Sequence, residues 1–389
     1  MRRMLSTMLL FVGLLGWMVV TTARAQLSTA ETQTTIAGSV TVINVPSTGG
    51  RIDYVNAQPM KLPGVPPRSD AEAVQDLIQA LTSPPTPGVS GYAPGWHGNG
   101  ERNPINLGIP AGAVAGVEPE EFGTSNHAFS TARADLNPAS TNTSYPYRAA
   151  GKLFFNIGSS TFLCSASLIK RGVVVTAAHC VSKFGANQIY SNWHFVPGYR
   201  NGAAPFGNWT AKEVFVLTSY LNGTDPCAQA GVVCRDDVAL LLLNTSATGA
   251  YPGTATGWYG FGFNGFGFTG SHQTEISQIG YPGCLDNGAL MERNDSSGFV
   301  SAANSNNTVI GSLMCGGSSG GPWVINLGIR PALTGTTAGT ASTPNVVVGV
   351  TSWGSTSNGP KEQGASPFLS GNIGTLVNAA CAAVPGACS

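Results

Sequence analysis

The chain has 389 residues, a length that suggests more than one structural unit, and its 19 Lys and Arg residues balance 19 Asp and Glu residues. This balance leaves no basic surface that would favour nucleic acid or an anionic membrane as a partner. Only 10% of the residues are charged and 51 are glycine, a composition that favours an exported all-β protein over a helical cytosolic one.

The N-terminus has the features of a secretion signal. Two arginines precede an apolar run over Leu9–Val20, and Ala23 and Ala25 are the small residues that a signal peptidase recognises. The run is shorter than the ~20 apolar residues that a membrane-spanning helix needs, so an uncleaved anchor is the weaker alternative. We therefore expect a signal peptide over residues 1–25 and a secreted, extracellular protein that begins at Gln26.

Residues 26–142 differ in composition from the rest of the chain. Two Pro-rich stretches exclude regular helix and central strand, and between them Ser69 and Glu72 form a capping box that opens one helix. The apolar residues expected on the buried stripe of this helix are Val74, Leu77, Ile78 and Leu81. Because the region lacks the periodicity of a large core, we expect an otherwise irregular pro-region that rests on a later domain, with a surface linker as the alternative.

Residues 143–389 contain short β-rich segments separated by turns, a pattern typical of a β-sandwich or a pair of barrels. The expected strands include Lys152–Ile157, Phe162–Ile169, Val173–Ala177, Glu213–Leu217, Val238–Leu243 and Val346–Trp353. Gly257–Gly270 alternates glycine with aromatic residues, which predicts a tight hairpin, with a binding surface as the alternative.

The first motif with chemical meaning is Thr176–Cys180, which ends in His179 and Cys180. A lone histidine after a strand is usually structural, but this one stands at a strand end, where loops present functional groups. Cys180 can hold the turn in place through a disulfide to Cys164 on the preceding strand.

The second motif is the pair Asp236 and Asp237 at the start of the apolar run Val238–Leu243. A carboxylate in this place is partly desolvated, which is costly unless it accepts hydrogen bonds. A histidine ring N–H is a suitable donor, and the pairing leaves the other ring nitrogen free to act as a base. We expect Asp237 to orient His179, whereas Asp236 fits a solvated acidic turn.

The third motif is Cys315–Pro322, with the sequence CGGSSGGP. A serine hydroxyl needs a base to become a nucleophile, and glycine neighbours let a substrate backbone approach it. The N–H groups of Gly317 and Ser319 can converge on one oxyanion, an effect of ~3–4 kcal/mol per donor. A flexible Gly/Ser loop, the alternative, explains the glycines but neither Cys315 nor the apolar strand that begins at Pro322.

The order of the motifs selects among hydrolase classes. Gly317–Gly321 also fits the G-x-S-x-G turn of α/β-hydrolases, in which the histidine follows the serine. All 5 histidines precede Ser319 here, which excludes that order. The order His179, Asp237, Ser319 is that of chymotrypsin, while the subtilisin order would need an Asp before the base, and the β-rich context disfavours it.

Residues 145–380 resemble the trypsin/chymotrypsin family and, within it, the bacterial glutamyl-endopeptidase-like branch. The segments that carry the resemblance are Phe162–Ile169, Thr176–Cys180, Asp237–Leu240, Gly280–Gly283, Gly316–Pro322 and Val350–Gly354. The resemblance implies an all-β fold of two perpendicular, antiparallel six-stranded barrels with the triad at their junction. It places Ser352 beside the catalytic carboxylate and makes Ser352–Gly354 an edge strand that pairs with the substrate backbone.

The resemblance also places the base of the primary specificity pocket six residues before the nucleophile, at Leu313, followed by Met314. A cationic side chain buried there would lose its hydration without an anionic partner, so cleavage after Arg or Lys is not expected. Thr351 stands near the place of the pocket histidine of the glutamyl branch, so strict Glu specificity is not expected either, unless His272 or Arg330 reaches the pocket. We expect a preference for Leu, Met or Phe. The expected substrate-binding residues are Leu313, Met314, Ser352, Trp353 and Gly354.

The chain departs from the family pattern in two respects. Ser318 replaces the Asp that receives the freed N-terminus in trypsin-like zymogens, so this activation switch is expected to be absent. The usual cysteine after Gly354 is missing, which leaves Cys284 as the expected partner of Cys315. An even cysteine count in an exported chain indicates disulfides. The expected pairs are Cys164–Cys180, Cys227–Cys234, Cys284–Cys315 and Cys381–Cys388.

The sequence thus predicts a secreted, monomeric serine endopeptidase made as a zymogen, which hydrolyses proteins or peptides through an acyl-enzyme formed on Ser319. We expect no metal or other cofactor, no nucleic-acid partner, and no membrane association after signal cleavage. The alternatives are a catalytically inactive homologue that serves as a binding module, and an esterase on the same fold.

Overall fold

The computed structural model describes residues 34–46, 50–66, 69–82, 89–110, 121–122, 128–135, 140–301, 306–328, 343–356 and 362–389. All of them belong to one unit of the chain, Thr32–Ser389. The expected signal peptide and Arg330 lie outside the described residues. Among the helices of the described ranges, none has the length and apolar character needed to span a membrane.

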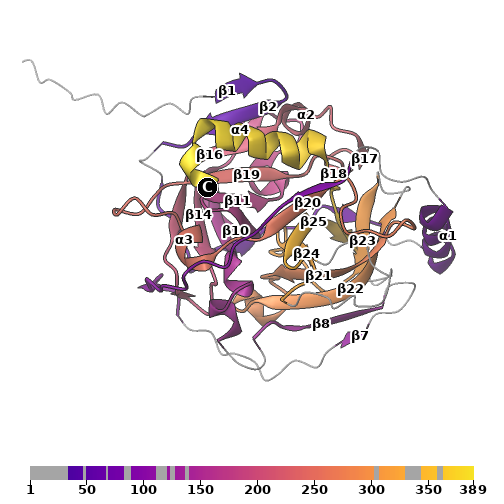
Figure 1. Cartoon of the computed structure of the whole chain (residues 1–389), viewed down its shortest axis with the longest axis horizontal. Coiled ribbons are helices and arrows are strands. Elements are labelled where there is room, and N and C mark those ends of the chain that lie inside the picture. Colours follow the sequence, from indigo (N-terminus) through magenta and orange to yellow (C-terminus); the bar gives the residue numbers. More distant parts are fainter. Residues whose placement is uncertain are drawn as a thin grey trace, which may run out of the picture. The chain divides into compact units, whose positions relative to one another are not determined.

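Six antiparallel strands close into a first barrel (Figure 1). They are β9 (Ala150–Ile157), β10 (Ser160–Lys170), β11 (Val173–Thr176), β14 (Ser191–Pro197), β16 (Trp209–Leu217) and β19 (Ala239–Leu243). Pairing runs β9-β10-β11-β19-β16-β14 and returns to β9. Helix α4 (Thr375–Ala383) packs against β16 and β19, so β19 is buried along its whole length, which explains its unbroken run of apolar residues.

A second barrel closes in the same way from six antiparallel strands. They are β21 (Gln273–Gly280), β22 (Glu292–Ser301), β23 (Asn307–Gly311), β24 (Pro322–Ile325), β25 (Val346–Ser355) and β26 (Glu362–Ala365). Pairing runs β21-β24-β25-β26-β23-β22 and returns to β21. The expected all-β fold of two six-stranded antiparallel barrels is therefore confirmed.

Short elements connect the barrel strands. They are η2 (Tyr147–Ala149), η3 (Ala178–Cys180), β12 (Ser182–Lys183), β13 (Gln188–Ile189), β15 (Ala203–Ala204), α2 (Thr218–Asn222), β17 (Cys227–Gln229), β18 (Val232–Cys234), α3 (Gly253–Thr256), η4 (Asp286–Gly288), η5 (Ser370–Gly374) and η6 (Pro385–Ala387).

The prediction of a tight hairpin within Gly257–Gly270 is wrong. β20 (Gly260–Phe263) pairs instead with two distant strands, antiparallel with β5 (Gly91–Ala93) and parallel with β25. A Cβ atom on Gly260 would lie 2.7 Å from the Ala93 carbonyl oxygen. Gly260 therefore permits close approach of another backbone.

The description of residues 26–142 as irregular apart from one helix is also wrong, because short strands join this region to both barrels. They are β1 (Thr34–Ala37), β2 (Val40–Asn44), β3 (Gln58–Pro59), β4 (Gly64–Val65), β5, β6 (Ile105–Asn106), β7 (Glu121–Phe122) and β8 (Phe129–Arg133), followed by the turn η1 (Thr141–Thr143). β2 extends the first barrel beside β16, and β8 pairs with β22 of the second. These strands have two to five residues, too few for a sequence period, and they form because barrel strands supply their partners.

The predicted helix is α1 (Asp70–Thr82), and its capping box is present. The Ser69 N–H donates to the Glu72 carboxylate at 2.7 Å, and the Glu72 N–H donates to the Ser69 hydroxyl at 3.3 Å. These two bonds satisfy backbone donors that the first turn leaves without helical partners.

The predicted apolar stripe of α1 is only partly correct. Val74 and Ile78 are 42% and 48% exposed, whereas Leu77 packs into a cluster with Phe299 and Trp353. The side chain of Leu81 lies outside the description. α1 contacts the second barrel along β22, and the narrow contact leaves the flanks of the stripe in solvent.

Candidate active site

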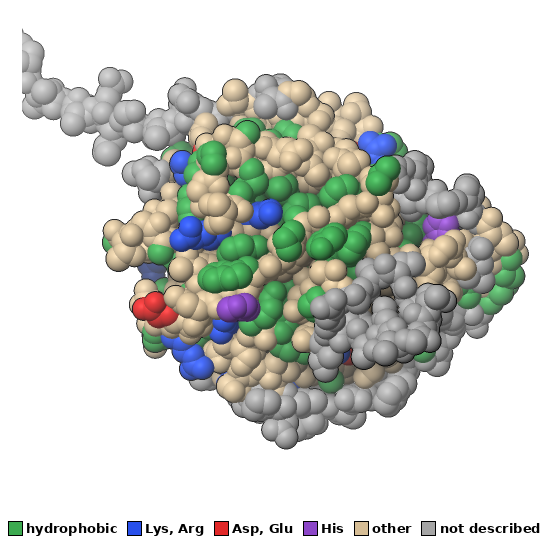
Figure 2. Space-filling view, in the orientation of Figure 1, with side chains coloured by type: hydrophobic (Ala, Val, Ile, Leu, Met, Phe, Trp, Pro, Cys, Tyr) green, Lys and Arg blue, Asp and Glu red, His purple; other side chains and the backbone are tan. Residues whose placement is uncertain are grey.

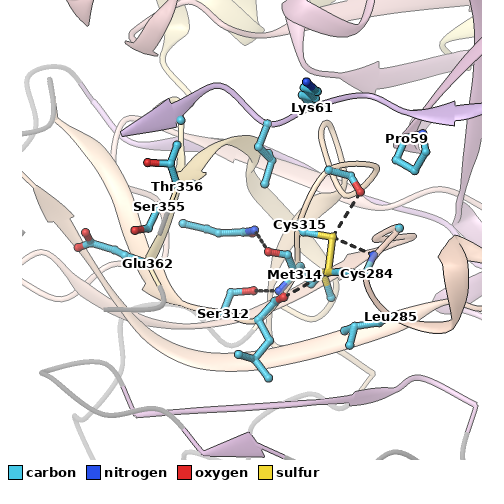
Figure 3. A pocket seen from close by; sticks show the side chains of 17 residues that line it. Pro59, Lys61, Cys284, Leu285, Ser312, Met314, Cys315, Ser355, Thr356 and Glu362 are labelled. Carbon is cyan, nitrogen blue, oxygen red and sulfur yellow. Dashed lines mark hydrogen bonds between the residues drawn. A yellow bond between two sulfur atoms is a disulfide. The ribbon is translucent and has the colours of Figure 1, made fainter. Parts of the chain in front are cut away.

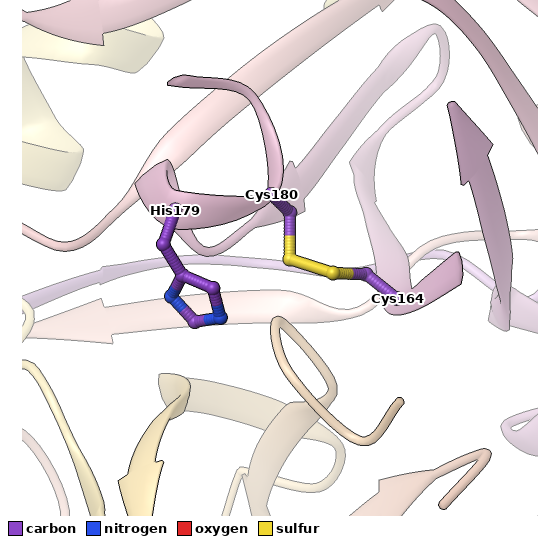
Figure 4. A group of neighbouring side chains, drawn as sticks. All are labelled: Cys164, His179 and Cys180. Carbon is purple, nitrogen blue, oxygen red and sulfur yellow. A yellow bond between two sulfur atoms is a disulfide. The ribbon is translucent and has the colours of Figure 1, made fainter. Parts of the chain in front are cut away.

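His179 lies in the turn η3, directly after β11. The disulfide Cys164–Cys180 joins this turn to β10 (Figure 4). The backbone N–H of His179 donates to Asp237 Oδ1 at 2.8 Å, and ring atom Nδ1 lies 2.8 Å from Asp237 Oδ2. An ionised carboxylate only accepts hydrogen bonds, so Nδ1 carries the ring proton and Nε2 keeps its lone pair.

Asp237 is buried just before β19 and accepts a third hydrogen bond, from Ser352 Oγ at 2.6 Å. Three donors offset the cost of removing its carboxylate from water. The structure therefore brings together the two predicted members of the acid–base pair and the serine that was expected beside them.

Asp236 is not the solvated residue that the sequence analysis expected. It is buried and accepts hydrogen bonds from Ser219 Oγ at 2.9 Å and from the Arg235 guanidinium at 3.2 Å. Its own N–H donates to Asp225 Oδ2 at 2.7 Å. Burial, reinforced by the charge of Asp236, raises the pKa of Asp225 to about 7. Asp225, which was not among the residues expected from the sequence, holds the turn that carries Asp237.

Ser319 sits in a loop that is tied to β10 and β25. The Ser165 N–H donates to the Ser319 carbonyl at 2.7 Å, and the Gly320 N–H donates to the Thr351 carbonyl at 2.8 Å. Gly320 has a positive φ of 76°, and a Cβ on it would lie 2.8 Å from the backbone nitrogen of Ala177. The nucleophile loop therefore lies directly against the residue that precedes the His179 turn.

The expected triad lacks its serine–histidine hydrogen bond in the structure. Ser319 Oγ and His179 Nε2 are both buried, and neither has a hydrogen-bond partner among the described residues. Buried polar atoms without partners are rare and concentrate where chemistry occurs, and nucleophile–base contacts are often loose in the absence of substrate.

The two expected oxyanion donors lie in the same loop. Gly317 has a positive φ of 97°, which only glycine adopts readily, and its N–H donates to the carbonyl of Met60 at 2.9 Å. Ser318, between the two donors, is buried and donates its hydroxyl to the Cys315 carbonyl at 2.7 Å. The hydroxyl of Ser318 thus has its hydrogen-bond partner within the same loop.

A cavity of about 800 Å³ adjoins this loop (Figure 3). Leu313, Met314 and Gly354, which were expected in the specificity pocket, are among the residues that line it. Ser352 and Trp353 do not: Ser352 bonds to Asp237, and Trp353 is buried with its Nε1–H on Asn307 at 2.8 Å. Successive side chains of a strand point to opposite faces, so Trp353 and its neighbours cannot share one pocket wall.

The pocket also contains residues that the sequence analysis missed. Glu362 and Gln363 of β26 line it because β26 pairs with β25, with Gln363 opposite Gly354. Gln363 Nε2 donates to the Met314 carbonyl, across the floor of the cavity. Among the described lining residues Glu362 is the one acid, and it is buried. His272, the residue considered as a pocket cation, is not among the lining residues.

All eight cysteines lie in disulfides, in the four pairs that the sequence analysis named: Cys164–Cys180, Cys227–Cys234, Cys284–Cys315 and Cys381–Cys388. Ligand atoms of Cys164, His179 and Cys180 lie within 4.8 Å of one another. Sulfurs joined in a disulfide are not thiolates, so this group lacks the anionic sulfur that metals bind. The group thus fits a histidine held by a disulfide better than a metal centre (Figure 4).

The fold and the site together define the class of chymotrypsin-like proteins. The fold has two antiparallel barrels. The site contains a buried aspartate that orients a histidine, and a serine that lies among glycines. Residues 138–368, more than half of the chain, match the trypsin family, and the chain belongs to that family.

Three proteins illustrate the similarity. An extracellular metalloprotease of Bacillus subtilis is 29% identical over 131 residues, which cover 31% of this chain and 35% of that protein. A glutamyl endopeptidase of Bacillus licheniformis is 22% identical over 149 residues, 38% of this chain and 40% of that protein. The chain thus matches well under half the length of either relative. The crystal structure of the protease Anisep from Arthrobacter nicotinovorans is 27% identical, covers 60% of this chain and 96% of that one, and has a TM-score of 0.48.

Proposed function

We propose that the chain is a secreted serine endopeptidase that hydrolyses peptide bonds through an acyl-enzyme on Ser319. The observation that carries the proposal is the network at Asp237, which accepts hydrogen bonds from the backbone and ring of His179 and from Ser352. This network serves no evident packing purpose, and it leaves Nε2 as the free basic atom beside a glycine-flanked serine.

In the proposed mechanism His179 Nε2 takes the hydroxyl proton while Ser319 Oγ attacks the substrate carbonyl carbon. The oxyanion forms against the N–H groups of Gly317 and Ser319. His179 then gives the proton to the leaving amine, and the C–N bond breaks to leave an ester on Ser319. Water, deprotonated by His179, hydrolyses this ester and restores the serine.

A fluorophosphonate probe tests the proposal because it labels only an activated serine. The processed chain should be labelled once, at Ser319, and Ser319→Ala should abolish the label. His179→Ala should slow labelling at least ~10²-fold, since the base is lost. An unlabelled processed chain would favour the inactive homologue. Labelling with ester hydrolysis but no peptide hydrolysis would favour the esterase.

We further propose that the pocket takes a medium-sized apolar side chain such as Leu, Met or Phe. Leu313 and Met314 line its wall, and Leu62 of the chain itself lies at its mouth, where a Cβ on Gly354 would be 3.3 Å from Leu62 Cδ1. Glu362 places an acid in the same pocket, and an ionised acid there would disfavour a substrate glutamate.

Chromogenic peptides that differ only at the residue before the cut test this specificity. We expect kcat/KM to be highest for Leu, Met or Phe and at least ~10-fold lower for Glu. In Glu362→Gln, cleavage after Glu should rise relative to Leu, because the repulsion is removed. A dominant preference for Arg or Lys would overturn the proposal and assign Glu362 as their partner. A dominant preference for Glu would show that a cation reaches the pocket from elsewhere.

Maturation is proposed to remove the signal peptide (1–25) and then most of the expected pro-region (26–142). The contacts of β8 favour a final cut before Phe129 rather than after residue 142. Arg133 makes a two-pronged ion pair with Asp286, and Asp135 pairs with Arg200 at 2.6 Å, so residues 129–135 belong to the folded protease. Because Ser318 is satisfied within its own loop, activation through a charge pair with the new N-terminus is not expected.

A further inference from the structure

A segment from the N-terminal region crosses the candidate active site. β3 runs parallel to β10, and next to it the Met60 N–H donates to the Leu163 carbonyl at 2.9 Å. The Met60 carbonyl then accepts the Gly317 N–H, also at 2.9 Å. The donor expected to stabilise the oxyanion is therefore already bonded to a carbonyl of the same chain.

The same segment continues along the edge strand expected to hold the substrate. β4 runs parallel to β25, the Gly354 N–H donates to the Pro63 carbonyl at 3.0 Å, and the Thr356 N–H donates to the Val65 carbonyl at 3.0 Å. The segment thus adds a parallel strand to the edge of the sheet, which is β-augmentation.

Glycines of the protease make room for this segment. A Cβ on Gly283 would lie 2.5 Å from Pro59 Cγ, and a Cβ on Gly316 would lie 2.7 Å from the Met60 carbonyl oxygen. Lys61 and Leu62 are among the residues that line the pocket, and Figure 3 shows Lys61 beside it. The segment thus contacts the oxyanion donor, the pocket and the substrate edge strand together.

We infer that Gln58–Val65 is an inhibitory segment, which keeps the zymogen inactive by occupying the oxyanion donor and the substrate strand of its own catalytic domain. The inference rests on the proposed function and adds how that site is regulated. With the segment in place Ser319 is fully buried and His179 is almost so, and no substrate carbonyl can reach the Gly317 N–H.

The strength of this inhibition depends on the covalent connection. Short parallel pairings are weak per residue, but a tether holds the segment near its site at an effective concentration of ~mM. A cut between the segment and β8 would remove this advantage, and the segment could then leave the cleft. Without the tether this effective concentration is lost, so the excised octapeptide should inhibit only weakly when it is added as a separate molecule.

The test uses the intact chain and the rate at which the fluorophosphonate probe labels Ser319, with mass spectrometry to verify that no cut has occurred. Leu62→Asp should weaken the segment, because it replaces an apolar side chain with a carboxylate in a pocket that Leu313 and Met314 line. We expect labelling about tenfold faster than in the wild type, since the rate follows the open fraction of the cleft. Val55→Asp is the matched control: it makes the same change at a residue that is 56% exposed, and its rate should stay within about twofold.

A synthetic peptide with the sequence of Gln58–Val65 provides a second measurement. Added to the Leu62→Asp chain, or to the wild-type chain nicked by limited proteolysis, it should slow labelling again, whereas the reversed sequence should not. If Leu62→Asp fails to fold, the nicked wild-type chain still tests whether the peptide inhibits labelling.

The outcomes separate the two proposals. If neither the intact nor the nicked chain is labelled, the proposed function fails. If intact and nicked wild-type chains are labelled equally fast, the protease stands and the inference is overturned. Rapid labelling of the nicked chain, with no effect of Leu62→Asp or of the peptide, would assign the inhibition to other residues and also overturn it.

Discussion

Asp237→Asn is expected to lower the rate of peptide hydrolysis by about 10⁴-fold, by analogy with the Ser-His-Asp triad, while the protein stays folded. The Asp237 carboxylate accepts hydrogen bonds from the N–H and ring Nδ1–H of His179 and from Ser352 Oγ. An asparagine amide that turns its NH₂ toward Nδ1 makes that atom an acceptor. The ring proton then moves to Nε2, and the base that should accept the Ser319 proton is lost.

Asp236→Asn is the matched control, because it makes the same change one residue earlier. Among the described residues Asp236 accepts hydrogen bonds from Ser219, Arg235 and Asn372, and none from His179. An asparagine keeps one acceptor and loses an ion pair whose arginine is half exposed, which is worth ~1 kcal/mol or less. We expect kcat/KM within about fivefold of the wild type, measured on the processed chain with one chromogenic peptide. A severe effect of Asp236→Asn together with a mild effect of Asp237→Asn would show that the acid has been misassigned.

The barrel strands could be predicted because their signal is local. Val173–Val175 and Ala239–Leu243 are continuous apolar runs bounded by turn residues, and each forms a strand with nearly the expected ends. The triad candidates were found for a similar reason: His179 follows one such run, Asp237 precedes another, and Ser319 lies in a glycine-rich loop just before a third. The order of these three residues along the chain then selected the chymotrypsin arrangement over that of the α/β-hydrolases.

The pocket could not be predicted to the same extent, because its walls come from strand register. Gln363 of β26 lies opposite Gly354 of the neighbouring strand β25, and no local sequence pattern indicates that pairing. The side chain of Trp353 could have been excluded from the cavity wall from the sequence alone, since side chains alternate along a strand and Ser352 was already assigned to the carboxylate. The burial of Asp236 also depends on distant partners, in this case Ser219 and the turn at Asp225.

The inhibitory segment could not be predicted from a side-chain motif in the sequence. Its bonds to Gly317, Gly354 and Leu163 all involve backbone atoms, and its two strands have two residues each. Backbone pairing of this length depends on the partner surface rather than on the sequence of the segment.

Gly320→Ala is expected to destabilise the protein by about 2–5 kcal/mol, as measured by urea unfolding. Gly320 has a φ of 76°, and a Cβ there would lie 2.0 Å from Thr176 Oγ1, 2.5 Å from the Ser165 carbonyl oxygen and 2.8 Å from the Ala177 nitrogen. The last two are backbone atoms, so relief requires movement of β10 or of the turn before His179. Gly371→Ala is the control, since no atom lies within 4 Å of its Cβ position, and it should change stability by less than about 0.5 kcal/mol.

The rate of labelling by the fluorophosphonate probe should show whether Gly320 also positions Ser319, in addition to its effect on stability. The movement that relieves the clash also moves Ser319 away from His179, and a misplacement of about 1 Å costs ~10²-fold in rate. The folded fraction of Gly320→Ala, prepared at low temperature, should therefore react with the fluorophosphonate probe at least ~10²-fold more slowly than the processed wild type, while Gly371→Ala reacts normally. Normal reactivity in a destabilised Gly320→Ala would show that the nucleophile loop is positioned by contacts other than those with β10 and the His179 turn.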